Sequence, residues 1–330
     1  MRPCLLLGLA YVLFACAAVP TVPAALETQP VAEGEDAADD PAIWVNPGDP
    51  GASVVLGTSK RGGLYVYDLT GAVRQYLPVG NLNNVDLRAQ AWGDPSRVLI
   101  AASARRPASL VLLELDPNTG DVRLARKHGL DLHEPYGSCM YQAPDGGLYV
   151  IVNDKDGRFE QYVLHADHRL ELARVWRLDS QPEGCVADDA RQVLYLGEEK
   201  RGIWQMSADP LQAMERRLVD EVGERLVADV EGLTIIGDAL VASSQGNSSY
   251  AVYDLPSAEF VGSFRVGTGG EADAVSGTDG IAGVDDVLPG FEQGLLVVQD
   301  DVNTNPPANQ NFKYVSWRSV LMALSITTPR

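Results

Sequence analysis

Three acidic residues stand directly before glycine at a constant interval along this chain. The pairs Glu183-Gly184, Glu231-Gly232 and Asp279-Gly280 recur every 48 residues. Carboxylates at a regular period could hold cations or move protons if the fold brings them together. Asp-Gly and Glu-Gly are also common turn dipeptides, but a turn preference explains a single occurrence better than it explains a constant interval.

A second set of residues, which is basic, follows short apolar segments in four successive units. It comprises Lys60-Arg61, Arg105-Arg106, Lys155 with Arg158 nearby, and Lys200-Arg201. Guanidinium and ammonium groups suit phosphate oxygens, although basic residues in loops also serve solubility. The pattern predicts a local positive patch beside the carboxylates.

The elements that must position these residues have the pattern of β-strands. Segments such as "AIWVN", "SVVLGTS", "GLYVYDL" and "VLYLGEE" are short, rich in Val, Leu, Ile and Tyr, and bounded by Gly, Asp, Asn or Pro. No long stretch has sustained helical periodicity. The nearest case is Pro210 to Val222, which we expect to hold a helical turn or two within a loop.

The acidic pairs extend backward in looser form and divide the chain into units. Asp40, Asp86 and Tyr136 mark three earlier units, so six units begin near residues 40, 86, 136, 183, 231 and 279. Four strands in a period of about 45 to 50 residues are typical of a propeller blade. The sequence therefore predicts an all-β fold, a six-bladed β-propeller whose four-stranded antiparallel blades surround a central channel.

Two consequences follow from a propeller fold. The last unit ends soon after "NFKYVSW", so we expect the N-terminal segment to supply its outer strand and close the ring. Equivalent positions of successive blades surround the axis, so carboxylates at the starts of the innermost strands would converge on one mouth of the channel. Such a cluster is strongly repulsive unless cations lie among the carboxylates.

Composition excludes one class of function and agrees with another. The 330 residues carry 26 Lys and Arg against 45 Asp and Glu, for a net charge of −19. This acidity argues against binding to nucleic acid. It suits either solubility outside the cell or the binding of hard cations such as calcium.

The first residues resemble an export signal. Arg2 is followed by an apolar run from Leu5 to Val19, which is too short for a stable membrane span. We expect residues 1–25 to be a signal peptide cut after Ala24 or Ala25, and residues 26–330 to form a single domain. The alternative is a lipoprotein signal ending before Cys16, so the protein is periplasmic or secreted, or lipid-anchored through Cys16.

Export leaves two cysteines in the folded domain, Cys139 and Cys185. Two cysteines are not a disulfide framework. They could pair, but buried free thiols are the favoured interpretation. We expect no transmembrane segment, and we expect the domain to be a monomer.

Longer motifs identify a family. The stretches "DDPAIWVNP", "LPVGNLNNVDLR", "DGRFEQY", "EGCVADD", "DVEGLTI", "ASSQGNSSYAVYD", "TDGIAG" and "ANQNFK" occur in order between Glu27 and Lys313. Together they resemble the β-propeller phytases, the alkaline calcium-dependent family. The resemblance implies a six-bladed propeller that binds several calcium ions, structural and catalytic. It also implies stepwise phosphate release from phytate, or calcium-phytate, as a 3-phytase.

The resemblance also implies roles for particular residues, four of which (Tyr136, Glu183, Glu231 and Asp279) the repeat had already selected. The implied catalytic residues are Glu183, Asp279, Glu231, Arg105 and Tyr136. The implied substrate-binding residues are Lys60, Arg61, Arg105, Tyr136, Lys155 and Asp156. The implied calcium ligands are Asp39, Asp40, Val85, Glu183, Glu199, Asp229, Glu231, Gln245, Asp273, Asp279, Asp300 and Asn303.

A mechanism follows from the charges. Phytate and this protein are both anionic, so bridging calcium would resolve their repulsion. We expect a calcium-activated water, oriented by Glu183 or Asp279, to attack phosphorus directly. Arg105, Lys60 and Tyr136 would hold the phosphate oxygens.

Two other functions remain open on the sequence. The same fold could be a non-catalytic module that binds inositol phosphates or calcium. It could also be a calcium-dependent propeller lactonase, although a lactonase would not need Lys60, Arg105 and Lys155 around its calcium.

Overall fold

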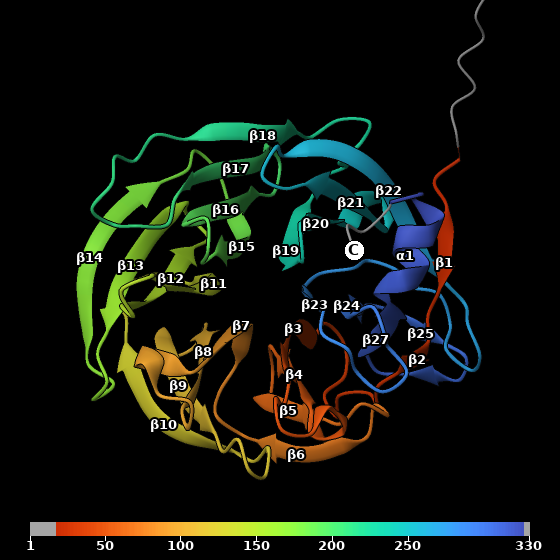
Figure 1. Cartoon of the computed structure of the whole chain (residues 1–330), viewed down its shortest axis with the longest axis horizontal. Helices are drawn as coiled ribbons and strands as arrows, with labels where there is room; N and C mark the ends of the chain where they lie inside the picture. The colour runs from red at the N-terminus through yellow and green to blue at the C-terminus, as the bar shows by residue number, and fades with distance from the viewer. Residues whose placement is uncertain (1–17, 327–330) are drawn as a thin grey trace, which may run out of the picture.

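A computed structural model describes residues 18–326. Figure 1 shows sheets arranged in a ring around a central channel, each with its first strand nearest the axis. Six sheets each contain a blade of four antiparallel strands in sequence order or close to it, and one of these sheets gains a fifth strand at its outer edge. The prediction of a six-bladed β-propeller is confirmed.

The first three blades follow the chain in order, from the inner to the outer strand. Blade one has β3 (Ala38–Trp44), β4 (Val54–Ser59), β5 (Leu64–Tyr67) and β6 (Val73–Leu77). Blade two has β7 (Leu82–Ala89), β8 (Val98–Ala104), β9 (Ser109–Leu115) and β10 (Val122–Gly129). Blade three has β11 (Pro135–Gln142), β12 (Leu148–Asp154), β13 (Arg158–Leu164) and β14 (Leu170–Arg177).

The other three blades continue this order until the ring closes. Blade four has β15 (Pro182–Asp188), β16 (Val193–Glu198), β17 (Gly202–Ser207) and β18 (Arg217–Glu221). Blade five has β19 (Val230–Ile236), β20 (Ala239–Ser244), β21 (Ser249–Asp254) and β22 (Glu259–Gly267). Blade six has β23 (Ile281–Val284), β24 (Leu295–Asp300) and β27 (Asn311–Ser316). Short elements outside the blades are η1 (Pro50–Ala52), η2 (Ala91–Gly93), η3 (Gln245–Asn247), β25 (Asn303–Thr304) and β26 (Pro307–Ala308).

The N-terminal segment closes the ring, as predicted. Strand β2 (Leu26–Glu27) pairs antiparallel with β27 and so becomes the outer strand of blade six. Just before it, β1 (Thr21–Pro23) pairs parallel with β22 at the edge of blade five. Val22 and Ala24 are buried there.

This arrangement bears on the predicted leader, most of which lies in residues 1–17, outside the described residues. A cut after Ala24 or Ala25 would remove β1 from the mature protein. The position of the cut, and the alternative anchor at Cys16, stay predictions.

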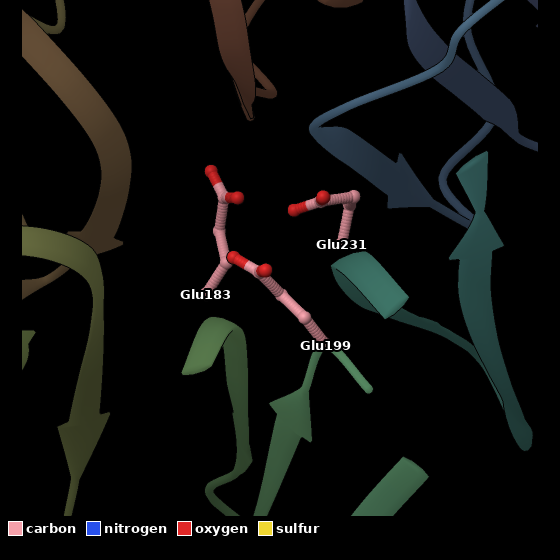
Figure 2. Close-up of side chains that lie close together, drawn as sticks. All are labelled: Glu183, Glu199 and Glu231. Carbon is pink, nitrogen blue, oxygen red and sulfur yellow. The ribbon is translucent and has the colours of Figure 1, made fainter. Parts of the chain in front are cut away.

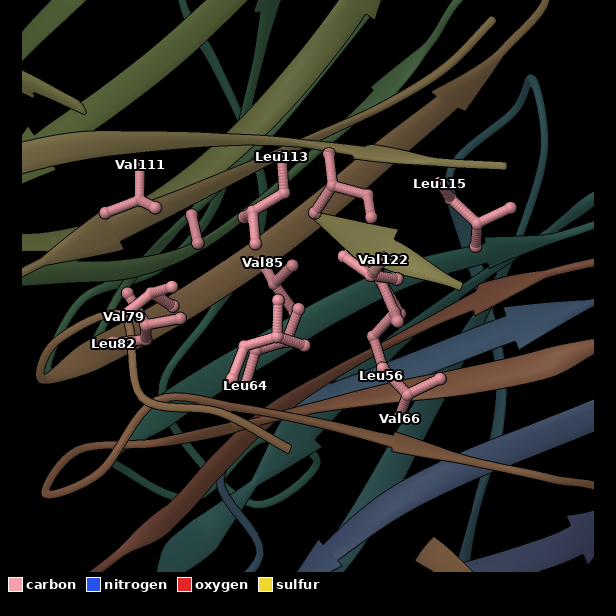
Figure 3. Packing of buried hydrophobic residues seen from close by; sticks show 14 of the residues in the cluster. Leu56, Leu64, Val66, Val79, Leu82, Val85, Val111, Leu113, Leu115 and Val122 are labelled. Carbon is pink, nitrogen blue, oxygen red and sulfur yellow. The ribbon is translucent and has the colours of Figure 1, made fainter. Parts of the chain in front are cut away.

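The hydrophobic core lies between adjacent blades. Strands β8 and β9 are buried along nearly their whole length, which is why their sequences, "VLIAASA" and "SLVLLEL", lack the alternation of a half-exposed strand. Figure 3 shows one interface, in which Leu56, Leu64 and Val66 of blade one face residues of blade two, including Val85 and Leu113. Burial of each Val or Leu contributes about 1.5–3 kcal/mol, so the packed blades hold the inner strands in place.

A disulfide joins Cys139 to Cys185, so the interpretation of these residues as free thiols was wrong. The two residues lie in β11 and β15, the inner strands of adjacent blades, and their Cα atoms are 5.7 Å apart. Sequence could not place them side by side because the link spans a blade boundary. The bond fixes blade three to blade four beside the channel.

The expectation of helical turns in Pro210 to Val222 was also wrong. Residues 210–216 form a loop, and most of the rest of this segment is β18 (Arg217–Glu221), the edge strand of blade four. The helix that the structure does describe is α1 (Trp317–Ala323), which follows the last strand. It buries Trp317, Val320 and Leu321 in the same apolar cluster as β1. No helix among residues 18–326 is long and apolar enough to cross a membrane.

Candidate functional site

The inner strands begin with a shared irregularity that sets the direction of their side chains. In β3, β7, β11, β15 and β19 the pairing with the next strand shifts register after the first residue. Such bulges re-aim side chains and are common beside active sites. The first bulged residue is Asp39, Asn83, Tyr136, Glu183 or Glu231, and Asp279 precedes β23 in the sixth blade. We call these six residues the mouth ring.

The glycines that follow four of these residues are required by close packing between blades. A Cβ at Gly184 would lie 2.1 Å from the carbonyl oxygen of Glu231, and one at Gly137 would lie 1.7 Å from that of Glu183. Gly280 donates its backbone N–H to the Asp39 carbonyl at 3.1 Å. The dipeptide therefore combines a side chain for the channel with a backbone that the next blade can approach.

The ring differs from the sequence prediction in blades one and two. In blade one Asp39 occupies the ring position, whereas the sequence analysis marked that unit by its neighbour Asp40. Asp86 was expected to mark the unit of blade two, but it lies three residues further along β7 and pairs with Arg88 toward the other end of the channel. Asn83 occupies the ring position instead. Asn83 is neutral, so a search for a repeat of acidic residues passes over it. Only the register of β7 against β8 shows that it takes the ring position.

Three carboxylates converge most closely. One oxygen each from Glu183, Glu199 and Glu231 lies within 4.8 Å of the others, and all three residues are buried. Figure 2 shows them reaching one space from β15, from the turn after β16 and from β19. Three buried oxygens near this space have no hydrogen-bond partner among the described residues: Asp39 Oδ2, Asn83 Oδ1 and Glu231 Oε2. A buried set of oxygen donors with unsatisfied atoms fits a hard cation such as calcium.

Burial and mutual repulsion shift the acidity of this cluster. Burial raises the pKa of Glu183 to about 7, and Asp39 and Glu199 add to the rise while Glu231 and Lys60 oppose it. Burial likewise raises the pKa of Asp279 to about 8, against the attraction of Lys60. The pKa of Glu199 rises to about 7, and those of Asp39 and Glu231 also rise, chiefly through burial. Without a cation, the cluster therefore retains protons near neutral pH.

Lys60 is the positive charge closest to the ring. Its Nζ lies 2.5 Å from Asp36, 3.1 Å from Asp39 and 3.0 Å from Asp279. Burial alone would lower the pKa of Lys60, but Asp39 and Asp279 outweigh it, so the pKa is raised and the ammonium stays charged. It compensates part of the carboxylate charge on the side of blades one and six.

Two other basic residues border the ring beside Tyr136. The guanidinium carbon of Arg105 lies 5.5 Å from the centre of the Tyr136 ring, and Lys155 Nζ lies 4.3 Å from it. Glu134, which sequence analysis did not select, pairs with Arg105 and lies 3.4 Å from Lys155 Nζ. Arg105 and Lys155 are half-buried and flank the phenol of Tyr136, and we call these two residues the basic rim.

Two of the predicted substrate-binding residues are turned to other partners. Arg61 pairs with Glu35 at 2.7 Å, and Asp156 pairs with Arg177 at 2.6 Å. Both pairs are exposed, so they cost little to rearrange.

The remaining predicted residues of the mouth lie beside the ring. Gln245 donates to Asp279, and the Gln245 N–H donates to the Asp229 carbonyl at 3.0 Å. Asp229 lies near enough to Glu199 to raise the pKa of that carboxyl.

The predicted structural calcium ligands form two further clusters. Asp40 is buried and accepts the Val85 N–H at 2.9 Å. Asp273, Asp300 and Asn303 come together around the buried ammonium of Lys313, at 2.6, 3.1 and 2.7 Å. Lys313 was not selected from the sequence, and its ammonium supplies positive charge to this second cluster. The calcium assignment of both clusters stays a prediction.

Solved structures with little sequence similarity share the fold. An auxiliary nutrient binding protein from Bacteroides thetaiotaomicron matches with a TM-score of 0.59 and 12% identity, over 89% of this chain and 75% of that chain. The PQQ-bound aldose sugar dehydrogenase from Streptomyces coelicolor matches with a TM-score of 0.54 and 13% identity, over 91% of this chain and 99% of that one. At these identities the matches speak for the fold alone.

Sequence comparison identifies the family. The chain is 38% identical to the 3-phytase of Bacillus subtilis (strain 168) over 329 residues, which cover 92% of this chain and 85% of the relative. The family model for phytases matches residues 10–327. The mouth ring and its basic rim therefore lie in a chain that belongs to the phytase family.

Proposed function

We propose that this protein hydrolyses phosphate monoesters of phytate in a calcium-dependent reaction, as a 3-phytase. The observation that supports it most is the mouth of the channel, where buried carboxylates lie beside Arg105, Lys155 and Tyr136. Some oxygens of these carboxylates have no partner in the part of the chain that the structure describes. A cation site next to phosphate-binding groups suits a polyanionic substrate. Family membership points to the same reaction.

The basic rim binds and orients the phosphate. Arg105 can offer a fork of N–H donors to two oxygens, and Lys155 adds a point charge. The phenol of Tyr136 donates a hydrogen bond and stays protonated, because burial and the nearby Glu183 raise its pKa. Phosphate oxygens would take the place of Glu134 on Arg105 and Lys155.

The carboxylates hold the cation and accept the proton of the attacking water. Glu183, Glu199, Glu231, Asp39 and Asp279 would hold calcium, which when bound supplies positive charge for the phosphate oxygens and lowers the pKa of water. In the cation-free protein burial raises the pKa of Glu183 to about 7 and that of Asp279 to about 8. With calcium bound, the one of these two carboxylates that the ion does not engage would accept the proton of the attacking water. Either could serve as the general base.

The placement of basic residues on three blades favours inositol polyphosphates over simple monoesters as substrates. Lys155 and Arg105 lie on blades three and two, whereas Lys60 lies on blade one. Cations on three blades can engage more than one phosphate of the same ring. The exposed Arg61 would turn to the outer phosphates once its ion pair with Glu35 opens, and Asp156 would lie beside the substrate as an acidic neighbour of Lys155.

Export agrees with this activity. A disulfide between β11 and β15 persists in an oxidising compartment, so we infer a periplasmic or secreted protein. The alternative of a lipid anchor through Cys16 stays open, and the expectation of a monomer is part of this proposal.

Phosphate release from phytate by the purified protein tests the proposal, measured near pH 7.5 with calcium and then with excess chelator. We expect release only with calcium, and much slower release from nitrophenyl phosphate. Calcium and phytate binding without release would instead favour the non-catalytic binding module. Lactone hydrolysis without phosphate release would favour the lactonase.

A further inference from the structure

We propose that Asn83 is the sixth working member of the mouth ring, with two roles. Its side-chain N–H positions the carboxylate of Glu183, and its side-chain oxygen Oδ1 is a ligand for the cation held there. This inference rests on the proposed function for its effect on catalysis, but its effect on calcium binding is independent of turnover.

Strand register supports this assignment. The pairing of β7 with β8 shifts between Leu82 and Val85, as the pairing of β15 with β16 shifts between Pro182 and Cys185. Asn83 is therefore the counterpart of Glu183 within its own blade. The backbone carbonyl of Asn83 accepts the hydroxyl of Thr58 from blade one, which fixes the strand at this point.

The contacts of Asn83 show that its side-chain nitrogen is hydrogen-bonded, whereas its side-chain oxygen has no partner among the described residues. Its Nδ2 donates to Asn84 Oδ1 at 2.9 Å and to Glu183 Oε1 at 3.2 Å. Two acceptors around this atom identify it as the nitrogen, so the other amide atom is the oxygen. That oxygen has no partner among the described residues, although Asn83 is fully buried. An unsatisfied buried carbonyl loses its hydration without gaining a partner, so such an atom calls for a ligand.

Charge explains why this position carries an amide. Asp39, Glu183, Glu199, Glu231 and Asp279 already place five carboxyl groups around the mouth, and the first four of these residues are buried. A sixth carboxylate would increase their repulsion. An asparagine oxygen is an established type of calcium ligand and adds no charge. Its N–H also stabilises the ionised form of Glu183, the form that binds a cation.

Isothermal titration with calcium chloride tests both roles in the full-length mature protein. The binding step lost in Glu231→Gln identifies the channel mouth. Asn83→Leu keeps the volume of the side chain but removes both polar atoms, and we expect it to weaken this step about 10- to 100-fold, as expected when a metal ligand loses its support. Asn83→Asp restores an oxygen ligand but not the N–H that supports Glu183, so we expect its calcium affinity to lie between those of Asn83→Leu and the wild type.

Asn46→Leu is the matched control. Asn46 is also a buried asparagine, but it lies beyond the far end of β3 and caps a turn by accepting the N–H groups of Gly48 and Asp49. We expect this variant to have a lower melting temperature and an unchanged calcium step at the mouth.

A double-mutant cycle separates positioning from packing. If Asn83 acts on Glu183, the effect of Asn83→Leu on calcium affinity is much smaller in a Glu183→Gln background. Wild-type calcium affinity in Asn83→Leu would overturn both roles, and equal effects in both backgrounds would overturn the positioning of Glu183 by Asn83. Loss of the calcium step in a protein that releases no phosphate would support the role of Asn83 while refuting the proposed activity.

Discussion

The two ends of the channel are built from the same inner strands, but the charged groups are paired at one end and incompletely paired at the other. At the far end, Arg88 bonds Asp189 at 2.6 Å, Asp86 at 3.0 Å and the Met140 carbonyl at 2.6 Å. At the mouth, the buried atoms Asp39 Oδ2 and Glu231 Oε2 have no hydrogen-bond partner among residues 18–326. A cavity of about 430 Å³ between the strands reaches from Asp40 to Arg88.

This difference separates structural charges from functional ones. Arg88, Asp86 and Asp189 tie blades two, three and four together, and their hydrogen bonds offset the cost of burial. The mouth is stable only if it retains protons or binds cations. The end with uncompensated charges is the one where a ligand can bind with a large gain.

The largest expected effect on activity comes from replacing one carboxyl group by an amide, and we compare this substitution at the two ends of the channel. Glu183→Gln should reduce phosphate release about 1,000-fold, in the range found when a key electrostatic group is removed. It should raise the melting temperature in chelator, because a buried like charge is lost. Asp189→Asn should do the reverse, with release nearly unchanged and a lower melting temperature because Arg88 loses its partner. Activity assays and thermal melts in parallel check this prediction, and a similar profile for both variants would contradict it.

Reduction of the disulfide is the next largest effect. Closing a loop of 46 residues should contribute about 4 kcal/mol to the free energy of unfolding by the chain-entropy estimate. Cys139 and Cys185 lie three and two residues from Tyr136 and Glu183, so the double variant to Ser should also lose activity. Urea unfolding with and without reductant measures the loss of stability, and no shift in the midpoint would show that packing alone holds these blades.

Calcium should stabilise the protein more at pH 8 than at pH 5. Glu183, Glu199 and Asp279 have folded pKa values of about 7, 7 and 8, above their unfolded values. The calcium-free folded state therefore holds protons that the unfolded state has lost, and its stability falls as pH rises from about 4 to 8. Lys60, with its raised pKa, contributes equally throughout this window. Calcium at 100 times its dissociation constant should return about 2.7 kcal/mol per site.

Melting curves in chelator and in calcium across this range provide the measurement. The gain in melting temperature on adding calcium should grow with pH. An equal gain at pH 5 and pH 8 would show that the raised carboxyl groups do not bind the cation.

Sequence predicted the architecture well because blade repeats depend on local patterns. Alternation, turn residues and the 48-residue interval were enough to predict six blades, and the short last unit was enough to predict closure by the N-terminal segment. The acidic repeat identified Glu183, Glu231 and Asp279, whose side chains the fold does bring to one mouth. These features depend on residue type and interval, which a sequence displays directly.

The remaining parts of the site depend on register and on contacts between blades. Asn83 was missed because its bulge is visible only in the pairing of β7 with β8. Glu134 and Lys313 were missed because their partners lie on other strands, and the disulfide was missed for the same reason. Sequence intervals locate a blade to within a few residues, whereas a site needs the correct residue.

The smallest expected effect concerns the glycine that allows the mouth ring to form. A Cβ at Gly184 would lie 2.1 Å from the Glu231 carbonyl oxygen, so Gly184→Ala should cost about 1–3 kcal/mol of stability through overpacking. Gly129→Ala is the control, because a Cβ there meets nothing within 4 Å. Since the clash falls between Glu183 and Glu231, calcium affinity should fall along with stability in the first variant and stay unchanged in the second. A loss of stability with unchanged calcium affinity would mean that the blades can shift at this point without moving the carboxylates, and that the acidic-glycine repeat serves packing alone.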